Sequence, residues 1–185
     1  MSRTFGAIRQ IAFIVRDLDT ALRYWTESLG VGAFFVLRRS TPGDYRYRGK
    51  PSPAPCLSVA LGNSGDVQVE IIQQHDDVPS AYRDFLAKGG EGFQHVSSWL
   101  TREEYDATMA RLRDASAVVV HEGIVREANV RFAYFETDLV PSGFVYEIAD
   151  MLDPSIYPLA EMIAEAARTW DGRDPVPEIP SLGAR

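Results

Sequence analysis

The order of predicted elements repeats once along the chain, and this repeat limits the fold more than any other feature. The first half is predicted to hold a strand at 8–15, a helix to about residue 28, a strand at 33–39 and a hairpin at 57–61 and 67–73. The second half is predicted to hold a strand at 93–99, a helix that Thr101 caps, and strands at 117–125, 130–136 and 144–149. Two strand–helix–strand–strand–strand modules therefore predict two similar half-sheets related by a pseudo-twofold axis.

The segments outside the repeat divide the chain further. We predict one domain over residues 1–150, with modules at about 7–74 and 91–150 and a linker helix at 75–90. Residues 151–185 are predicted to form an amphipathic helix and a proline-rich extended tail, which could cover this domain or a neighbouring subunit. Residues 40–55 show no usable periodicity and are expected to form a long loop.

Four polar side chains stand in the otherwise apolar first and last strands of the modules. Gln10 and Glu70 belong to the first module, and His95 and Glu147 stand at matching places in the second. Alternate residues of a strand share a face, so we expect His95 to share its face with Phe93 and each of the four polar groups to lie on a mostly apolar surface. Their recurrence in two modules favours a common site, although each residue alone would more often be a surface or hydrogen-bonded residue.

A carboxylate on an apolar face must be paired, protonated or bound to a cation. Within these strands no Lys or Arg shares a face with Glu70 or Glu147, so a divalent metal ion is the simplest compensation. One amide oxygen, two carboxylates and one imidazole suit Zn²⁺, Ni²⁺, Co²⁺, Mn²⁺ or Fe²⁺, and the set lacks the sulfur of a structural zinc site. His75 and His121 have no such setting, and we expect them to be solvated or capping residues.

Composition excludes several classes of function. Acidic residues outnumber basic ones 26 to 19, giving a formal charge of −7, which argues against a nucleic-acid partner. The apolar runs are of strand length, so we expect no membrane span, and the first residues lack the features of a secretory signal. We therefore expect a cytoplasmic protein.

The segments that carry these residues resemble the vicinal oxygen chelate superfamily, which includes glyoxalase I, methylmalonyl-CoA epimerase and extradiol dioxygenases. The resembling segments are 8–19, 69–72, 90–96 and 146–148, and the resemblance covers nearly all of residues 8–150. It implies an α+β fold in which two tandem βαβββ modules form an open, curled mixed sheet around a metal ion. It also implies that Gln10, Glu70, His95 and Glu147 are the metal ligands; many members have His where this chain has Gln10, and some glyoxalases have Gln there.

The function that the resemblance implies is that of a divalent-metal-dependent isomerase, epimerase or lyase of the glyoxalase type. Glu147 and Glu70 would carry the proton next to a metal-bound carbonyl or enediolate. The substrate would be a small carbonyl compound or an acyl thioester, and the protein a homodimer. The alternative is a binding protein of the resistance type that performs no chemistry. An extradiol dioxygenase is less favoured, because that chemistry uses two His and one carboxylate, of which only His95 and Glu147 remain.

The predicted loop at 40–55 is locally basic in an acidic protein. Arg46 and Arg48 are its candidate substrate-binding residues, since a phosphate or carboxylate of a substrate tail could dock there. The alternative is a solvated loop without a role in binding.

Overall fold

The computed structural model describes residues 4–137 and 143–177 of the 185-residue chain. In this part of the chain a single ten-stranded mixed sheet has the strand order β2-β5-β6-β1-β7-β10-β9-β8-β3-β4. The strands are β1 (Ile8–Ile14), β2 (Phe35–Ser40), β3 (Gly43–Tyr47), β4 (Lys50–Pro51), β5 (Leu57–Ser64), β6 (Val67–Gln74), β7 (Gly92–Trp99), β8 (Val119–Val125), β9 (Val130–Glu136) and β10 (Val145–Ala149). The helices are α1 (Leu18–Arg23), the π-helical turn η1 (Tyr24–Ser28), α2 (Ala81–Ala87), α3 (Arg102–Asp114) and α4 (Tyr157–Thr169).

The two modules meet at the centre of the sheet, where β1 and β7 pair in antiparallel orientation. In each module the first strand is parallel to the last, β1 to β6 and β7 to β10. The other strands of each module continue outward in corresponding order. This arrangement confirms the predicted curled mixed sheet of two βαβββ units.

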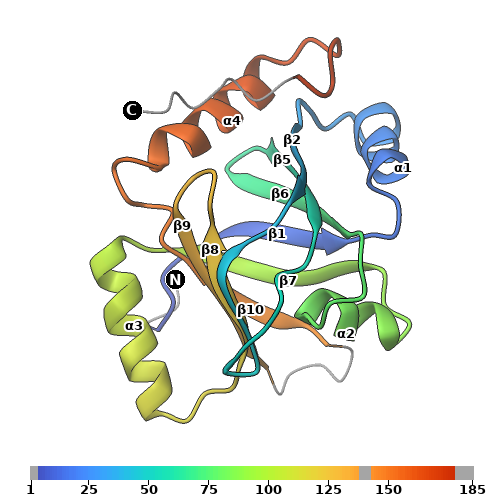
Figure 1. Cartoon of the computed structure of the whole chain (residues 1–185). Helices are drawn as coiled ribbons and strands as arrows, with labels where there is room; N and C mark the ends of the chain where they lie inside the picture. Colours follow the sequence, from blue (N-terminus) through green and yellow to red (C-terminus); the bar gives the residue numbers. More distant parts are fainter. Residues whose placement is uncertain (1–3, 138–142, 178–185) are drawn as a thin grey trace.

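The helices of the two modules lie on opposite sides of the molecule, α1 near β6 and α3 near β9 (Figure 1). Each begins at a capping side chain. Asp17 accepts from the backbone of Thr20 at the start of α1, and Thr101 and Glu104 form the predicted capping box of α3. Both helices bury apolar side chains on the outer face of the sheet, which leaves the concave face for other groups.

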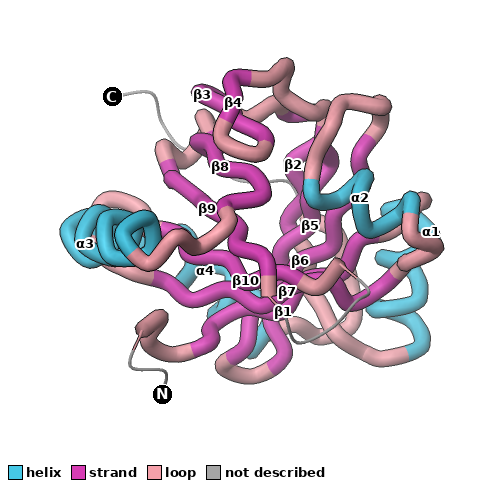
Figure 2. The backbone as a smooth tube through the Cα atoms, turned by 90° about the horizontal axis from the view of Figure 1, so that it is seen from below, coloured by secondary structure: helices cyan, strands magenta, loops and turns pink. Residues whose placement is uncertain are grey.

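Residues 40–55 contain two strands, which corrects the prediction of a long loop. β2 ends at one edge of the sheet, and after Thr41 and Pro42 the chain enters β3, which pairs with β8 near the opposite edge. Figure 2 shows the resulting U-shaped sheet, with β3 and β4 across its open side. The sheet is therefore almost closed by a connection of two residues.

The C-terminal segment packs on its own domain. Figure 1 shows α4 crossing one end of the curled sheet, and α4 contacts β5. Ala160 and Ile163 form its buried side, and the backbone N–H of Phe34 donates to the carbonyl of Pro175 (2.8 Å). Among the described residues, no helix has both the length and the apolar character needed to cross a bilayer.

Candidate metal centre

Strand register places the four predicted residues in equivalent positions of the two modules. In each module the glutamate of the last strand lies opposite the residue two positions after Gln10 or His95. These pairs are Ala12 with Glu70 and Ser97 with Glu147. The pairing between β1 and β7 follows the same symmetry, since Gln10 lies opposite Ser97 and Ala12 opposite His95. The pseudo-twofold relation therefore holds for the individual residues as well as for the strands.

Glu70, His95 and Glu147 converge on the concave face. The Nε2 atom of His95 lies 3.4 Å from Oε2 of Glu70 and 3.7 Å from Oε2 of Glu147. One ligand atom from each of the three residues falls within 4.8 Å of the others. His95 is fully buried and Glu147 is 7% exposed, so water does little to screen the group.

The orientation of His95 is fixed by Gln94. The side-chain amide nitrogen of Gln94 donates to the carbonyl of Ala81 (3.2 Å), so its Oε1 faces Nδ1 of His95 (2.7 Å). Because this oxygen can only accept, Nδ1 carries the proton and Nε2 is the bare nitrogen. The lone pair of Nε2 is therefore directed towards the carboxylates of Glu70 and Glu147, as metal ligation requires.

A β-bulge makes this contact possible. Ala12 pairs with His95 and Phe13 with Phe93, so Gln94 is an extra residue without a partner on β1. The bulge turns Phe93 to the face opposite that of His95, where it packs against Phe13 and is 47% exposed. The expectation that Phe93 and His95 share a face was wrong, because strict alternation fails at a bulge.

The electrostatics of the three residues fit a bound divalent cation. Burial raises the pKa of Glu70 to about 8 and that of Glu147 to about 7, whereas it lowers the pKa of His95 to about 4. Oε2 of Glu70 is buried and has no hydrogen-bond partner in the described structure. Oε2 of Glu70 and the unprotonated Nε2 of His95 both lack a positively charged partner. A cation held by Glu70, His95 and Glu147 would be a partner for both atoms.

Gln10 lies beside this cluster and lines the same cavity. Its side-chain nitrogen donates to Oε1 of Gln68 (2.8 Å), which faces it from the neighbouring strand. In the described structure this bond leaves Oε1 of Gln10 free of hydrogen bonds. Its role as a fourth ligand stays a prediction, and the arrangement suits an amide oxygen that ligates a cation.

Two buried residues at this site escaped the sequence analysis. Tyr134 lies opposite Glu147 on the neighbouring strand, and its hydroxyl is 3.2 Å from Nε2 of His95 and 3.1 Å from the hydroxyl of Tyr82. His121 lies opposite Tyr134 on β8 and is fully buried, so the expectation of a solvated residue was wrong, whereas its Nδ1 accepts from the first backbone N–H of α2, at Ala81 (3.4 Å), as a capping group does. The sequence signals for this layer were Tyr134 within the apolar strand β9 and His121 directly after the apolar run 118–120.

His75 is partly buried, and its Nε2 lies 2.7 Å from Oγ of Ser58. It lines neither the cavity nor the second pocket. His75 thus connects the end of β6 to β5 through its contact with Ser58.

Two members of the cluster lie in the wall of a cavity of about 660 Å³. Glu70 and Glu147 face this cavity together with Tyr82 and Tyr134, and Leu159 of α4 lines it from the C-terminal segment. Most of the other lining side chains are apolar. A volume of this size accommodates a small-molecule ligand of ordinary dimensions.

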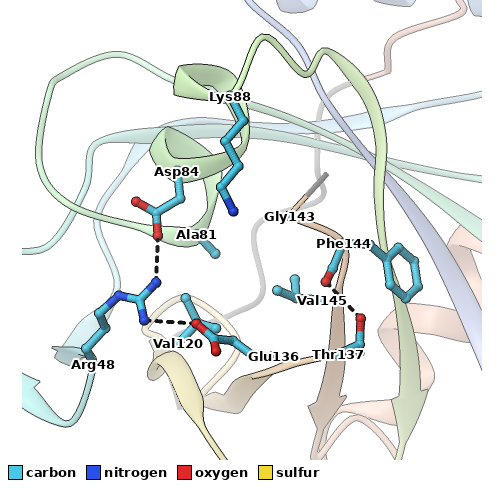
Figure 3. A pocket seen from close by; sticks show the side chains of 10 residues that line it. All are labelled: Arg48, Ala81, Asp84, Lys88, Val120, Glu136, Thr137, Gly143, Phe144 and Val145. Carbon is cyan, nitrogen blue, oxygen red and sulfur yellow. Dashed lines mark hydrogen bonds and ion pairs between the residues drawn. The ribbon is translucent and has the colours of Figure 1, made fainter. Parts of the chain in front are cut away.

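Arg46 and Arg48 lie outside this cavity. Arg48 lines a separate pocket of about 320 Å³, where its guanidinium binds Asp84 (3.4 Å) and Glu136 (2.9 Å), as Figure 3 shows. The ammonium group of Lys88 also points into this pocket (Figure 3). Arg46 is exposed and donates to the carbonyl of Gly49 (3.4 Å). Neither arginine is placed beside the Glu70 cluster.

A comparison with protein families identifies the chain. Residues 9–135 match the model of the glyoxalase/bleomycin resistance protein/dioxygenase superfamily. The chain belongs to this superfamily. No curated protein sequence matches it.

Solved structures agree with the superfamily fold. Methylmalonyl-CoA epimerase from Mycobacterium tuberculosis is 18% identical, with a TM-score of 0.52 over 80% of this chain and 91% of that one. A hypothetical protein from Bacillus halodurans is 15% identical, with a TM-score of 0.53 over 77% and 92%. A Streptomyces coelicolor methylmalonyl-CoA epimerase in complex with 2-nitronate-propionyl-CoA is 19% identical, with a TM-score of 0.50 over 78% and 94%. At these identities the likeness establishes the superfamily fold.

Proposed function

We propose that this superfamily member is a divalent-metal-dependent isomerase, epimerase or lyase that abstracts a proton next to a carbonyl group. The observation that carries the proposal is the pair of carboxylates, Glu70 and Glu147, that lie 3.4 and 3.7 Å from the bare Nε2 of His95 in the wall of a largely apolar cavity. The structural likeness to epimerases agrees with this class of reaction and leaves the substrate open.

The protein side chains have distinct roles in this proposal. Glu70, His95 and Glu147, with Gln10 as the fourth ligand, would hold the metal ion. A bound divalent cation supplies Lewis-acid stabilisation of negative charge on a substrate oxygen. Either Glu147 or Glu70 takes the proton from carbon and returns it, because a carboxylate that lines the cavity within reach of the substrate can act as general base and then as general acid.

Tyr134 contributes through its position. Its hydroxyl contacts His95, and it lies opposite Glu147 on the neighbouring strand. Because a metal ion would occupy Nε2 of His95, we infer that the hydroxyl then donates to the carboxylate of Glu147, whose pKa a hydrogen bond from Tyr134 lowers. Burial is the largest cause that raises the pKa of Tyr134 well above that of a free tyrosine. The hydroxyl therefore keeps its proton and can donate a hydrogen bond.

The proposal is tested by isotope exchange in the metal-loaded protein. A set of α-hydroxyketones and acyl thioesters is incubated in heavy water, and deuterium at the carbon next to the carbonyl is measured by NMR. We expect exchange with at least one compound and a loss of about 100-fold or more in Glu147→Gln, since general acid–base catalysis contributes on this scale. Glu103→Gln, which changes an exposed glutamate of α3, is the matched control and should keep full activity.

Metal binding is tested separately by isothermal titration with Zn²⁺, Co²⁺, Ni²⁺, Mn²⁺ and Fe²⁺. Failure of every metal to bind the wild-type protein would overturn the proposal. Binding that survives in the His95→Ala variant would place the metal elsewhere and would also overturn it.

The second candidate is a binding protein without catalysis, and the large apolar share of the cavity lining favours it. Such a protein would bind a ligand in this cavity without exchanging its carbon-bound protons. Ligand binding without deuterium exchange in the metal-loaded protein would therefore select this candidate over the enzyme.

A further inference from the structure

The charged side chains in the cavity wall all have the same sign. Glu70, Glu127 and Glu147 line the cavity, and among the described residues no Lys, Arg or His lines it with them. The remaining wall is built mainly from aliphatic and aromatic side chains of β2, β5, β9 and the segment around α4. The cavity is thus apolar over most of its surface and acidic at the positions where it carries charge.

A bound metal ion would leave the rest of the described cavity wall without positive charge. The two charges of a divalent cation are balanced by the carboxylates of Glu70 and Glu147, and Glu127 remains at the wall, where it accepts a hydrogen bond from Ser40 (2.6 Å). An anionic substrate would lose its hydration in the cavity and find no lysine or arginine to pair with. Burying an unpaired charge beside like charges is strongly unfavourable.

Two arginines of this region are engaged in ion pairs elsewhere. Arg38, in the strand that forms one wall, points to Asp19 on the outside (2.7 Å). Arg48 is held by Asp84 and Glu136 in the separate pocket. These ion pairs keep Arg38 and Arg48 away from the cavity, whose described lining contains neither of them.

We propose that the substrate of this cavity is an uncharged, largely apolar molecule with a carbonyl and a neighbouring oxygen, such as a substituted α-hydroxyketone. The proposal rests on the function proposed above and adds a substrate class to it. It separates this chain from enzymes whose substrates carry charged groups away from the metal, because such a group would find no cationic side chain in the described wall of the cavity. The aliphatic and aromatic wall contacts the hydrocarbon part, and only the oxygens reach the end that holds Glu70 and Glu147.

The test compares two fluorescent probes that differ by one charge. N-phenylnaphthylamine is neutral, and anilinonaphthalene sulfonate has the same rings with an added sulfonate. Both are titrated into wild-type protein with and without Zn²⁺. We expect the neutral probe to bind at least about tenfold more tightly in both forms, because the sulfonate would lose its hydration in an apolar cavity without a lysine or arginine to pair with, which costs more than the free energy of a tenfold change in Kd. Equal binding, tighter binding of the sulfonate or binding of neither probe would overturn the inference.

Two variants test whether the probes bind in this cavity. Leu37→Lys adds a cation to the wall on edge strand β2, and Ser64→Lys adds the same charge at the exposed turn between β5 and β6. In Leu37→Lys we expect the preference for the neutral probe to fall about tenfold or to reverse, and in Ser64→Lys to stay as in wild type. An unchanged preference in folded Leu37→Lys would overturn the inference, and the wild-type comparison decides alone if that variant does not fold.

The probes separate this inference from the proposed function. Neither probe has a carbonyl group, so their binding depends on the cavity and not on proton abstraction. A preference for the neutral probe without deuterium exchange would reject the enzyme and support the cavity inference. Exchange with tight binding of the sulfonate would support the enzyme and reject the substrate class.

Discussion

At the scale of single residues, Gln94 decides which nitrogen of His95 faces the carboxylates. Its amide is itself fixed by the carbonyl of Ala81, so a backbone group sets the tautomer of a candidate metal ligand through two hydrogen bonds. Such outer contacts commonly affect metal affinity nearly as much as the ligands do. Gln94 is therefore a positioning residue for the cluster.

Replacing Gln94 by Leu should weaken metal binding about 10- to 100-fold, because His95 would lose the acceptor that keeps its proton on Nδ1. The measurement is the Kd for Co²⁺, followed by its visible absorption. Gln73→Leu is the matched control, since it removes a partly buried amide that binds the backbone of Arg16 and Leu18 away from the cluster. It should lower stability and leave the Kd unchanged. A Gln94→Leu protein with wild-type affinity would show that the tautomer is set by another group.

The alternation of strand faces in the sequence identified the site residues that follow this alternation. It did not identify site residues whose direction or contacts depart from it. Glu70, His95 and Glu147 were recognised because each interrupts an apolar strand at a repeated place, and the structure brings these three together. Gln94 escaped because a bulge gives it an unexpected direction. Tyr134 escaped because its contact with His95 links strands far apart in sequence, and its own strand reads as ordinary core.

At the scale of elements, β3 is a strand that the local sequence does not predict. Gly43 starts it, Pro42 precedes it, and the left-handed backbone of Asp44 and Arg48 would ordinarily indicate turns. The strand forms because β8 offers a free edge and because Tyr45 is buried against His121. Both partners lie far from it in sequence, so no local pattern could predict it.

Changing Tyr45 to Phe tests how β3 is anchored. The hydroxyl of Tyr45 lies 3.0 Å from the carbonyl of Pro79 and 3.0 Å from Nδ1 of His121, and the ring is buried. Removal of the hydroxyl should lower the free energy of unfolding by about 1–3 kcal/mol, since it leaves buried polar groups with fewer partners. Urea unfolding measures this loss. Tyr24→Phe, at an exposed position, is the control and should change stability by less than about 0.5 kcal/mol. Equal losses in both variants would contradict the anchoring role.

At the scale of the whole molecule, the duplicated order of elements predicts the sheet but not the cavity. Two modules with the same element order determine which strands are central and which are parallel, as observed. The cavity also depends on Pro42 at the junction of β2 and β3 and on Leu159 of α4, both of which lie outside the repeat. The packing of these segments is set by three-dimensional contacts that the sequence pattern does not encode.

Four buried titratable groups determine how the stability of the metal-free protein depends on pH. Glu70 and Glu147 have pKa values raised by burial to about 8 and about 7, so the folded state keeps protons that the unfolded state releases above about 4.5. These two groups lower stability as the pH rises from about 4.5 to their folded pKa values. His95 and His121 have pKa values lowered by burial to about 4 and about 3, so they raise stability as the pH rises from there to about 6.5.

Above pH 6.5 the histidines no longer contribute, and the two carboxyls act alone. We expect the free energy of unfolding of the metal-free protein to fall between about pH 6.5 and pH 8, by up to about 1.4 kcal/mol per pH unit for each proton held only in the folded state. Urea unfolding in the presence of a chelator measures this slope. Saturating Zn²⁺ should remove it, because the metal binds the deprotonated carboxylates, and its stabilising effect should therefore grow with pH. The double variant Glu70→Gln, Glu147→Gln should be flat over the same range without metal. A slope that persists in this variant would assign the pH dependence to other groups of the protein.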